Sequence, residues 1–292
     1  MKVLVTGSRG QLGQAIMAAS EGVQDVEFIF TDLVCGEFQR ELALDITDRA
    51  AVFEMMKSNK VDVVVNCAGY TDVERAESEE DKAFGINSEA VSNLADAAAA
   101  CGAVLIHIST DYVFDGTSSS AYGEDAEPAP LSAYGRSKLA GELAVLASGC
   151  PYMIIRTSWM FSSYGKNFVK TMLRLGGEHA QLKVVNDQIG SPTYAPDLAE
   201  ALLQIISERD FQEGIYHYTN LGECSWWEFA MEIFRLAGQK VEVKPCSSEE
   251  YPSRVNRPKN AVLDKRKVQQ RLGLSIPHWK ESLQHCIDEL QA

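Results

Sequence analysis

Two patterns of apolar and polar positions alternate through the first half of the chain. Short apolar runs predict strands at residues 2–6, 26–30, 61–67, 104–109 and 152–157. Between the runs, the spacing of apolar residues predicts helices at 11–20, 47–56, 85–101 and 132–147. The 61–67 run is continuous and β-branched, which is typical of a strand buried on both faces. Strands that alternate with helices predict an α/β fold with a doubly wound, Rossmann-type parallel sheet.

The second half of the chain is less regular. Its patterns predict a strand at 214–219 and helices at 167–175, 197–207, 225–237 and 279–290. Proline and serine concentrate at 245–258, which predicts a surface loop. We therefore predict a sheet domain over 1–158, which residues 195–220 rejoin, and a smaller α/β lobe over 159–292.

The charge balance excludes several classes of partner. The 292 residues carry a formal net charge of −14, whereas binding to nucleic acids or anionic membranes needs clustered Lys and Arg. No apolar run has the length of a transmembrane helix, and the N-terminal apolar run is too short for a signal peptide. We expect a cytoplasmic protein with no nucleic-acid or membrane partner. The seven cysteines lack zinc-site and CxxC spacings, which favours reduced, mostly buried thiols.

Three glycines follow the first predicted strand and precede the first predicted helix. Gly7, Gly10 and Gly13 are spaced G-x-x-G-x-x-G. Glycines in this position allow a sharp turn and let backbone N–H groups approach a pyrophosphate at a helix N-terminus. Asp32, at the end of the second predicted strand, is placed to bond the adenosine ribose. Residues 1–158 are therefore predicted to bind a dinucleotide.

Two residues near this loop favour different cofactors. The Asp32 carboxylate would repel a 2′-phosphate and so favours NADH. Arg9, within the loop, could pair with that phosphate and favour NADPH, or could lie exposed in solvent. We expect NADPH or NADH as the cofactor, with the use of both as a hypothesis.

Further strand ends are expected to meet the cofactor. Asp45 and Ile46 end a short third strand and could lie against the adenine. Residues 66–71 follow the fourth strand, and small side chains there let the backbone approach the cofactor. Cys67 belongs to this segment, but nothing at a recognisable spacing would lower its pKa, which argues against a nucleophile.

A tyrosine and a lysine on one predicted helix suggest acid–base chemistry. Tyr134 and Lys138 are four residues apart and therefore share a helix face. A phenol has a pKa near about 10, so it needs a nearby cation that favours phenolate, and Lys138 could supply that field. Thr110, at the end of the fifth strand, could bond both a substrate carbonyl and the Tyr134 oxygen. This combination predicts a carbonyl-reduction site. The alternative is a surface helix with an unrelated Tyr and Lys.

Several segments narrow the interpretation through resemblance to a known family. The glycine loop, Asn-x-Ala, Ser-Thr-Asp-Tyr-Val-Phe and Tyr-x-x-x-Lys, in this order, resemble an extended short-chain dehydrogenase/reductase. More specific segments make the chain similar to the dTDP-4-dehydrorhamnose reductase family over nearly its whole length. They are Arg156-Thr157-Ser158-Trp159, residues 167–172, the Asn186-Asp187-Gln188-x-Gly190-x-Pro192-Thr193 segment, and Arg257-Pro258-x-Asn260.

The resemblance implies a reaction and a set of site residues. Reduced nicotinamide would deliver hydride to C4 of a dTDP-linked 4-keto-6-deoxy sugar, while Tyr134 protonates the oxygen and Thr110 polarises the carbonyl. The implied cofactor contacts are Gly10, Gln11, Leu12, Asp32, Asp45, Ile46, Gly69, Tyr70, Thr71, Tyr134 and Lys138. The implied substrate contacts are Thr110, Asp111, Trp159, Asn186, Gln188 and Arg257. Arg257 could pair with a diphosphate or merely be solvated on its loop.

One position departs from the family's pattern. Some members carry a Glu shortly after the third loop glycine and use it in a magnesium-bridged dimer, whereas this chain has Ala15 there. We therefore expect no required metal, and a monomer or a homodimer built differently.

Three other functions stay open. A nucleotide-sugar epimerase or dehydratase also uses Tyr-x-x-x-Lys, although dehydratases commonly have Asp-Glu where this chain has Asp111-Tyr112. A relative serves as a non-catalytic regulatory subunit of methionine adenosyltransferase, but Thr110, Tyr134 and Lys138 are retained here. A reductase of another nucleotide-linked keto sugar is the third alternative.

Overall fold

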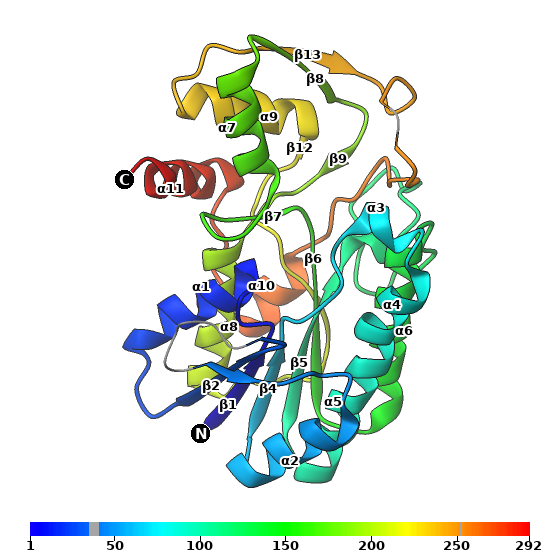
Figure 1. The fold of residues 1–292 in the computed structure, drawn as a ribbon, viewed down its shortest axis with the longest axis vertical. Helices are drawn as coiled ribbons and strands as arrows, with labels where there is room; N and C mark the ends of the chain where they lie inside the picture. The colour runs from blue at the N-terminus through cyan, green and yellow to red at the C-terminus, as the bar shows by residue number, and fades with distance from the viewer. Residues whose placement is uncertain (35–40, 252) are drawn as a thin grey trace.

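A seven-stranded parallel sheet forms the centre of the larger half of the molecule. The computed structural model describes residues 1–34, 41–251 and 253–292. The strand order is β3-β2-β1-β4-β5-β6-β11, and each neighbouring pair is parallel (Figure 1). The strands are β1 (Lys2–Thr6), β2 (Glu27–Asp32), β3 (Glu41–Ala43), β4 (Val63–Asn66), β5 (Val104–Thr110), β6 (Tyr152–Thr157) and β11 (Gly214–His217). The predicted doubly wound fold is confirmed.

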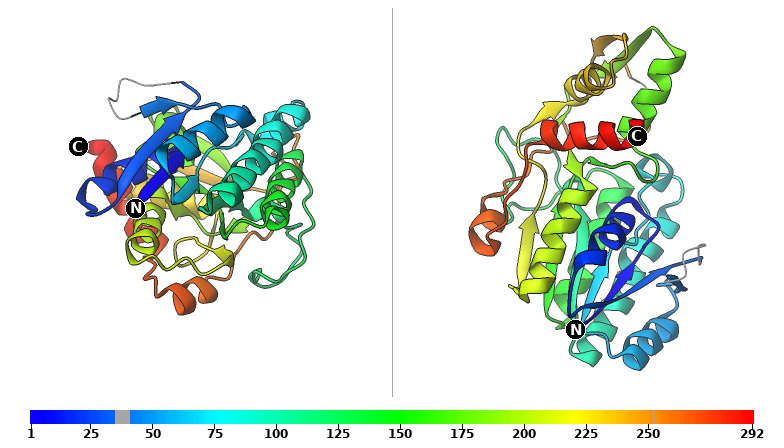
Figure 2. Two further views of the ribbon diagram at one scale, coloured as in Figure 1. Left: turned by 90° about the horizontal axis from the view of Figure 1, so that it is seen from below. Right: turned by 90° about the vertical axis from the view of Figure 1, so that its left-hand side faces the viewer.

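Helices cover both faces of this sheet, because each central strand is apolar on both sides. Val3 and Val5 pack toward α1 (Gln11–Ala19) and α8 (Ala195–Glu208). Leu4 lies on the opposite face. That face is covered by α2 (Arg49–Asn59), α5 (Ala90–Cys101) and α6 (Ala133–Ser148), as the views in Figures 1 and 2 agree.

The start of α6 is fixed locally, and this placement matters for the site. The Ser132 side chain accepts a hydrogen bond from the Gly135 N–H at 3.0 Å, which caps the helix. A side chain at Gly135 would not fit, because a Cβ there would lie 2.2 Å from the Tyr112 carbonyl oxygen. The glycine therefore lets α6 approach the segment that follows β5.

The smaller half lies beyond the carboxyl ends of the strands and has its own apolar core, which includes Phe161, Phe229 and Trp279. Figure 1 shows it in the upper part of the view. Its main elements are α7 (Phe168–Glu178), α9 (Trp226–Leu236), α11 (Trp279–Gln291) and the parallel pair β8 (Gln181–Val185) and β13 (Glu242–Cys246). Two short pairs connect it to the sheet: β7 (Met160–Phe161) with β10 (Thr193–Tyr194), and β9 (Ile189–Gly190) with β12 (Cys224–Ser225).

Several short elements complete the chain. They are α3 (Val73–Ala76), α4 (Glu80–Phe84), a π-helical turn (Gly85–Glu89), α10 (Arg266–Leu272) and 3-10 turns at Ser20–Gly22 and Asp111–Val113. No helix in the described part of the chain is long and apolar enough to cross a membrane.

Some sequence predictions are wrong in detail. The predicted loop at 245–258 begins too early, because Pro245 and Cys246 belong to β13. Proline fits there because β13 has a single partner in its two-stranded sheet and so can present the missing N–H on its free edge. The third strand ends at Ala43, before Asp45. The predicted helix at 85–101 begins with a π-helical turn, and β8 and α10 were not predicted.

Candidate active site

A cavity of about 650 Å³ lies where the carboxyl ends of the parallel strands face the smaller half. Its wall combines segments that are far apart in sequence: the glycine loop, the ends of β4 and β5, one face of α6, and the smaller half. Eleven of the predicted site residues line it: Gly10, Gln11, Leu12, Gly69, Thr71, Thr110, Asp111, Tyr134, Lys138, Trp159 and Arg257. These residues were predicted from separate segments of the sequence, and the fold places them around one cavity.

The glycine loop has the geometry of a dinucleotide cradle. Gly7 has φ +67°, and a Cβ there would lie 2.6 Å from the backbone N and Cα of Ala68. A Cβ on Gly13 would lie 2.4 Å from the Gly7 carbonyl oxygen. No described side chain caps the N-terminus of α1, so its N–H groups remain available to an anion. These features fit a pyrophosphate.

A second hollow, of about 340 Å³, adjoins the loop at the ends of β2 and β3. Its lining includes Gly7, Asp32, Asp45 and Ile46. The Asp32 carboxylate accepts hydrogen bonds from the backbone N–H groups of Arg9 and Leu33, at 3.0 and 2.8 Å. This arrangement leaves the carboxylate at the rim of a hollow next to the cradle, where an adenosine ribose is expected.

Three predicted cofactor residues, Arg9, Gly13 and Tyr70, are not among the described residues that line these cavities. Arg9 is exposed, and its side chain is not among those described around either hollow. Tyr70 is buried, with its N–H bonded to Asn87 Oδ1 at 2.8 Å and its hydroxyl to Glu79 at 3.0 Å. In this structure Tyr70 therefore supports the segment after β4 instead of facing the cavity.

Lys138 is a buried cation at the floor of the larger cavity. Only 6% of it is exposed, and its Nζ donates a hydrogen bond to the Ile108 carbonyl at 2.6 Å. Burial lowers the pKa of Lys138 to about 8, while the Glu142 carboxylate acts in the opposite direction. The ammonium is thus held against the backbone of β5.

Tyr134 stands beside Lys138 in the cavity wall, and its pKa differs from the sequence prediction. Burial raises the pKa of Tyr134, and the charges of Asp111 and Tyr112 add to this effect, whereas a hydrogen bond with Thr110 opposes it. The phenol is therefore neutral, which is the form that can donate a proton. The phenolate-favouring role of Lys138 stays a prediction.

Thr110 ends β5, and Asp111 begins the 3-10 turn that follows it. The Thr110 hydroxyl donates to Asp111 Oδ1 at 2.9 Å and accepts from the Tyr112 N–H at 3.2 Å. Asp111 is only 2% exposed, and its Oδ2 has no hydrogen-bond partner among the described residues. Burial raises the pKa of Asp111 to about 7, against the opposing charge of Arg257.

A buried ion pair, which the sequence interpretation missed, lies beneath these residues. Arg156 donates to Glu142 through Nε at 2.9 Å and Nη2 at 2.6 Å, and both side chains are 2% exposed. Ser109 also donates to Glu142, at 2.5 Å. The signal was present: Glu142 follows Lys138 by four residues on α6, and Arg156 is a lone charge in an apolar strand. The pair joins the ends of β5 and β6 to α6.

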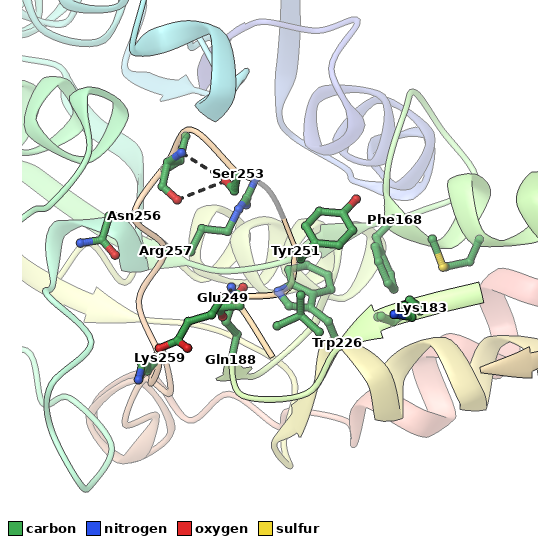
Figure 3. A pocket seen from close by; sticks show the side chains of 15 residues that line it. Phe168, Lys183, Gln188, Trp226, Glu249, Tyr251, Ser253, Asn256, Arg257 and Lys259 are labelled. Atoms are coloured by element: carbon green, nitrogen blue, oxygen red, sulfur yellow. Dashed lines mark hydrogen bonds between the residues drawn. The ribbon is translucent and has the colours of Figure 1, made fainter. Parts of the chain in front are cut away.

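A further cavity, of about 510 Å³, continues into the smaller half. Figure 3 shows Phe168, Tyr251 and Trp226 together on one side, with Lys183 near Phe168, and Arg257, Lys259 and Glu249 on the other side. Aromatic rings opposite Arg257 and Lys259 suit a ligand with a ring and an anionic group. Trp226 and Arg257 line both this cavity and the larger one, so the two hollows share a wall.

Arg257 is oriented by groups of the larger half. It donates to the Tyr112 hydroxyl at 2.8 Å and to the Glu74 carboxylate at 2.9 Å. Ser253 also donates to Glu74, at 2.8 Å. The guanidinium is therefore held at the junction of the two cavities and is more than a solvated loop side chain.

Two stacked tryptophans separate the cavities. The Trp159 and Trp226 rings lie 3.6 Å apart between centroids, with planes inclined by 13°. Trp159 has φ +47°, which is rare for a bulky side chain. A Cβ on Gly190 would lie 2.6 Å from the Trp159 indole, so this glycine provides its space. Phe168 packs on Trp226 at 4.6 Å. Trp226 was not predicted from the sequence.

The remaining predicted residues differ in their placement. Gln188 is buried, lines the smaller cavity and donates to the Ser248 hydroxyl at 2.9 Å. Asn186 is exposed and is not among the described residues that line either cavity. Cys67 lines the larger cavity, where burial raises the pKa of its thiol to about 12. A neutral thiol agrees with the interpretation that Cys67 is not a nucleophile.

Known proteins resemble this chain over its whole length. The family model described as RmlD substrate binding domain matches residues 1–292. A dTDP-4-dehydrorhamnose reductase of Sinorhizobium fredii is 39% identical, covering 98% of this chain and 97% of the relative. Two solved structures of dTDP-4-dehydrorhamnose reductases also match. The Clostridium acetobutylicum protein has TM-score 0.93 and 45% identity, covering 100% of both chains. The Bacillus anthracis protein, in complex with NADP, has TM-score 0.89 and 39% identity, covering 99% of both.

Proposed function

This chain belongs to the RmlD substrate-binding family, whose relatives are dTDP-4-dehydrorhamnose reductases, and on this premise we propose that it reduces the C4 ketone of dTDP-4-dehydro-L-rhamnose to give dTDP-L-rhamnose. The enzyme is an oxidoreductase that uses a reduced nicotinamide cofactor. The product is a precursor for cell-surface polysaccharides. One observation carries the proposal: the dinucleotide cradle and the Thr110–Tyr134–Lys138 group line one cavity, and the neighbouring aromatic cavity shares Trp226 and Arg257 with it.

The proposed reaction uses a small number of side chains. The bound cofactor supplies hydride to the carbonyl carbon. Tyr134, neutral because burial raises its pKa, donates its proton to the developing alkoxide. Thr110, which lines the same cavity, polarises the same oxygen. Lys138 carries the fixed positive charge of the site and bonds the nicotinamide ribose.

The sugar nucleotide is proposed to span both cavities. Arg257, with the orientation that Glu74 and Tyr112 give it, would pair with the diphosphate. Asp111 and Trp159 would contact the sugar in the larger cavity. Gln188 would contact the nucleotide in the smaller one. Asn186 remains a prediction, because it lies outside both linings.

The cofactor is NADPH or NADH, and the preference is open. Asp32 lies at the rim of the ribose hollow, which favours NADH. The Bacillus anthracis relative holds NADP. We keep the use of both cofactors as a hypothesis. Gly10, Gln11, Leu12, Gly69 and Thr71, which line the larger cavity, are proposed contacts, whereas Arg9, Gly13 and Tyr70 stay predictions from the sequence.

The binding roles of the two halves and the oligomeric state of the protein are also proposals. Residues 1–158, with about 195–220, would bind the dinucleotide, and the rest of 159–292 would bind the sugar nucleotide. Because Ala15 replaces the metal-binding Glu of some members, we propose a monomer or a homodimer without a required metal. Loss of more than half of the activity in EDTA, restored by magnesium, would contradict this.

The deciding experiment follows absorbance at 340 nm with dTDP-4-keto-6-deoxy-L-mannose and each cofactor. Stoichiometric NADPH or NADH consumption is expected. An epimerase or dehydratase would recycle its cofactor and show no net consumption. A regulatory subunit would show no turnover and would co-purify with a synthetase. Faster turnover of another nucleotide-linked keto sugar would reassign the substrate.

A further inference from the structure

A turn of the smaller half is hydrogen-bonded to the glycine loop. Gln11 is the first residue of α1 and directly follows the Gly10 N-cap. Its Oε1 accepts hydrogen bonds from the Ser162 hydroxyl and from the Asn167 Nδ2, both at 2.9 Å. Ser162 is fully buried. Residues 162–167 are therefore tied to the residue that begins the helix whose N-terminus forms the dinucleotide cradle.

Contacts within this turn hold its backbone in place. The Asn167 Nδ2 also donates to the Ser162 carbonyl at 2.7 Å, which closes the turn. The Asn167 Oδ1 accepts from the Lys170 N–H at 3.1 Å and so caps α7. Gly165 has φ +58°, and a Cβ there would lie 3.2 Å from the Gln11 Cγ. A glycine at this position therefore lets the turn lie close against Gln11.

Lys166 belongs to this turn and was not predicted as a site residue. It lines the larger cavity together with residues 10–12 of the glycine loop. Its side chain is exposed, and no hydrogen bond or ion pair engages its ammonium within the described part of the chain. The fold therefore fixes the backbone of Lys166 beside the cradle and leaves its charge available.

The other two cations in the described lining of this cavity already have partners. Lys138 donates to the Ile108 carbonyl. Arg257 donates to the Tyr112 hydroxyl and to the Glu74 carboxylate. Lys166 differs from both, because its ammonium can pair with an anion without giving up a protein contact.

A dinucleotide pyrophosphate needs more positive charge than backbone N–H groups supply. The chain carries a formal net charge of −14, so the field of the whole protein opposes the approach of an anion. The N-terminus of a helix is equivalent to only about half a positive charge, whereas a pyrophosphate carries a negative charge on each phosphate. An ammonium beside the loop would balance much of the difference.

We propose that Lys166 of the smaller half is a ligand of the pyrophosphate of the nicotinamide cofactor. The inference rests on the proposed reductase function and deepens it, because it assigns part of the cofactor site to the half proposed to bind the sugar nucleotide. The turn is bonded to Gln11 at the cradle, which favours the cofactor over the sugar nucleotide. Lys166 is not among the described residues that line the ribose hollow, so it should not distinguish NADPH from NADH.

The test measures the Kd of NADPH and of NADH by fluorescence titration without sugar nucleotide. Lys166→Met removes the charge and keeps the length of the side chain, whereas Lys166→Arg keeps the charge. Lys240→Met is the matched control, because Lys240 is exposed in the smaller half and lines none of the described cavities.

For Lys166→Met we expect both Kd values to rise by about 5- to 10-fold, between the effects of an exposed ion pair and a buried charged hydrogen bond. The rise should shrink at high salt, because ions screen the lost interaction. For Lys166→Arg and Lys240→Met, both Kd values should stay within about twofold of wild type. The Kd of dTDP, measured without cofactor, should also stay within about twofold in Lys166→Met.

A double-variant cycle tests the role of the turn. Asn167→Ser keeps a side-chain oxygen that caps α7 and removes the amide that bonds to Gln11. It should raise the Kd of NADPH about 2- to 5-fold in the wild-type background and less than about twofold in Lys166→Met, because both changes act on one interaction. Equal ratios in the two backgrounds would contradict the inference that the turn positions Lys166.

Each other outcome overturns the inference. Unchanged cofactor Kd values would show that Lys166 does not bind the pyrophosphate. A rise for NADPH alone would place Lys166 at the 2′-phosphate, and an equal rise for dTDP would make it a ligand of the sugar nucleotide or a general source of charge. An equal loss in Lys166→Arg or Lys240→Met would show a structural effect or an effect of overall charge.

Two further points keep the test decisive. If Lys166→Met does not fold, Lys166→Gln is measured instead and judged by the same Kd values. Failure of the reductase function is distinct, because the wild type would then bind NADPH and not consume it in the presence of the keto sugar.

Discussion

The two halves of the molecule hold their functional side chains by different means. In the sheet half, regular backbone sets the positions: Thr110 ends β5, and Tyr134, Lys138 and Glu142 repeat every four residues along α6. In the smaller half, packing sets them: Trp159 is held by Trp226 and by the space at Gly190. Secondary structure therefore positions the proposed catalytic side chains, whereas side-chain contacts determine the shape of the binding cavities. Four substitutions test whether the backbone or side-chain packing sets each position.

The largest effect is expected from the buried ion pair of the sheet half. Glu142→Gln leaves Arg156 charged and buried without its counter-ion, which should cost about 3–5 kcal/mol of unfolding free energy. Urea unfolding measures this. Replacing both partners, as Glu142→Gln with Arg156→Met, should recover part of the loss. If the free energy of unfolding of Glu142→Gln lies within about 1 kcal/mol of the wild-type value, the backbone alone fixes this region.

Tyr134→Phe should follow in size and should affect catalysis alone. Removal of the proton donor should lower kcat at least about 100-fold, which is about 2.7 kcal/mol. Cofactor binding should stay near normal, because the aromatic ring and its packing against Tyr112 are kept. Stopped-flow kinetics and cofactor titration check both points. A kcat within fivefold of wild type would contradict the assignment of Tyr134 as the proton donor.

Trp226→Ala tests the smaller half. An aromatic pair contributes about 0.5–1.5 kcal/mol beyond its buried area, so KM for the sugar nucleotide should rise by about 3- to 10-fold. The value of kcat should change less, because Trp226 lines the cavity from the smaller half and is not one of the groups proposed to take part in the chemical step. Trp226→Phe is the matched control and should retain most of the affinity. The reverse pattern, a large loss of kcat with constant KM, would contradict the contrast between the halves.

The smallest effect is expected at the cofactor rim. Arg9 is exposed, so Arg9→Ala should reduce kcat/KM with NADPH by only a few-fold and leave NADH nearly unchanged. Ratios of kcat/KM for the two cofactors measure this. A wild-type preference beyond 1000-fold, about 4 kcal/mol, would refute the use of both cofactors.

The same contrast explains how much could be predicted from the sequence. The strands β1, β4, β5 and β6 are buried on both faces and read as continuous apolar runs, so their ends, and Thr110 with them, could be located. The spacing of Tyr134 and Lys138 is a property of one helix. Trp226 could not be found, because its role depends on contact with Trp159 across a fold that local patterns do not specify. The strand β8 is half exposed and alternates weakly, so it has no clear signal.

The pairing of β11 with β6 has a consequence for the order in which the protein can be made. On the ribosome β6 is complete long before β11 and α8 emerge, so the growing chain presents an unpaired strand edge and an uncovered apolar sheet face. Residues 1–158 alone would lack the apolar side chains of α8, including Leu198 and Leu202, that cover the Val3–Val5 face. A nascent chain stalled at this point should recruit chaperones or aggregate, and this half should not be obtained as a stable fragment.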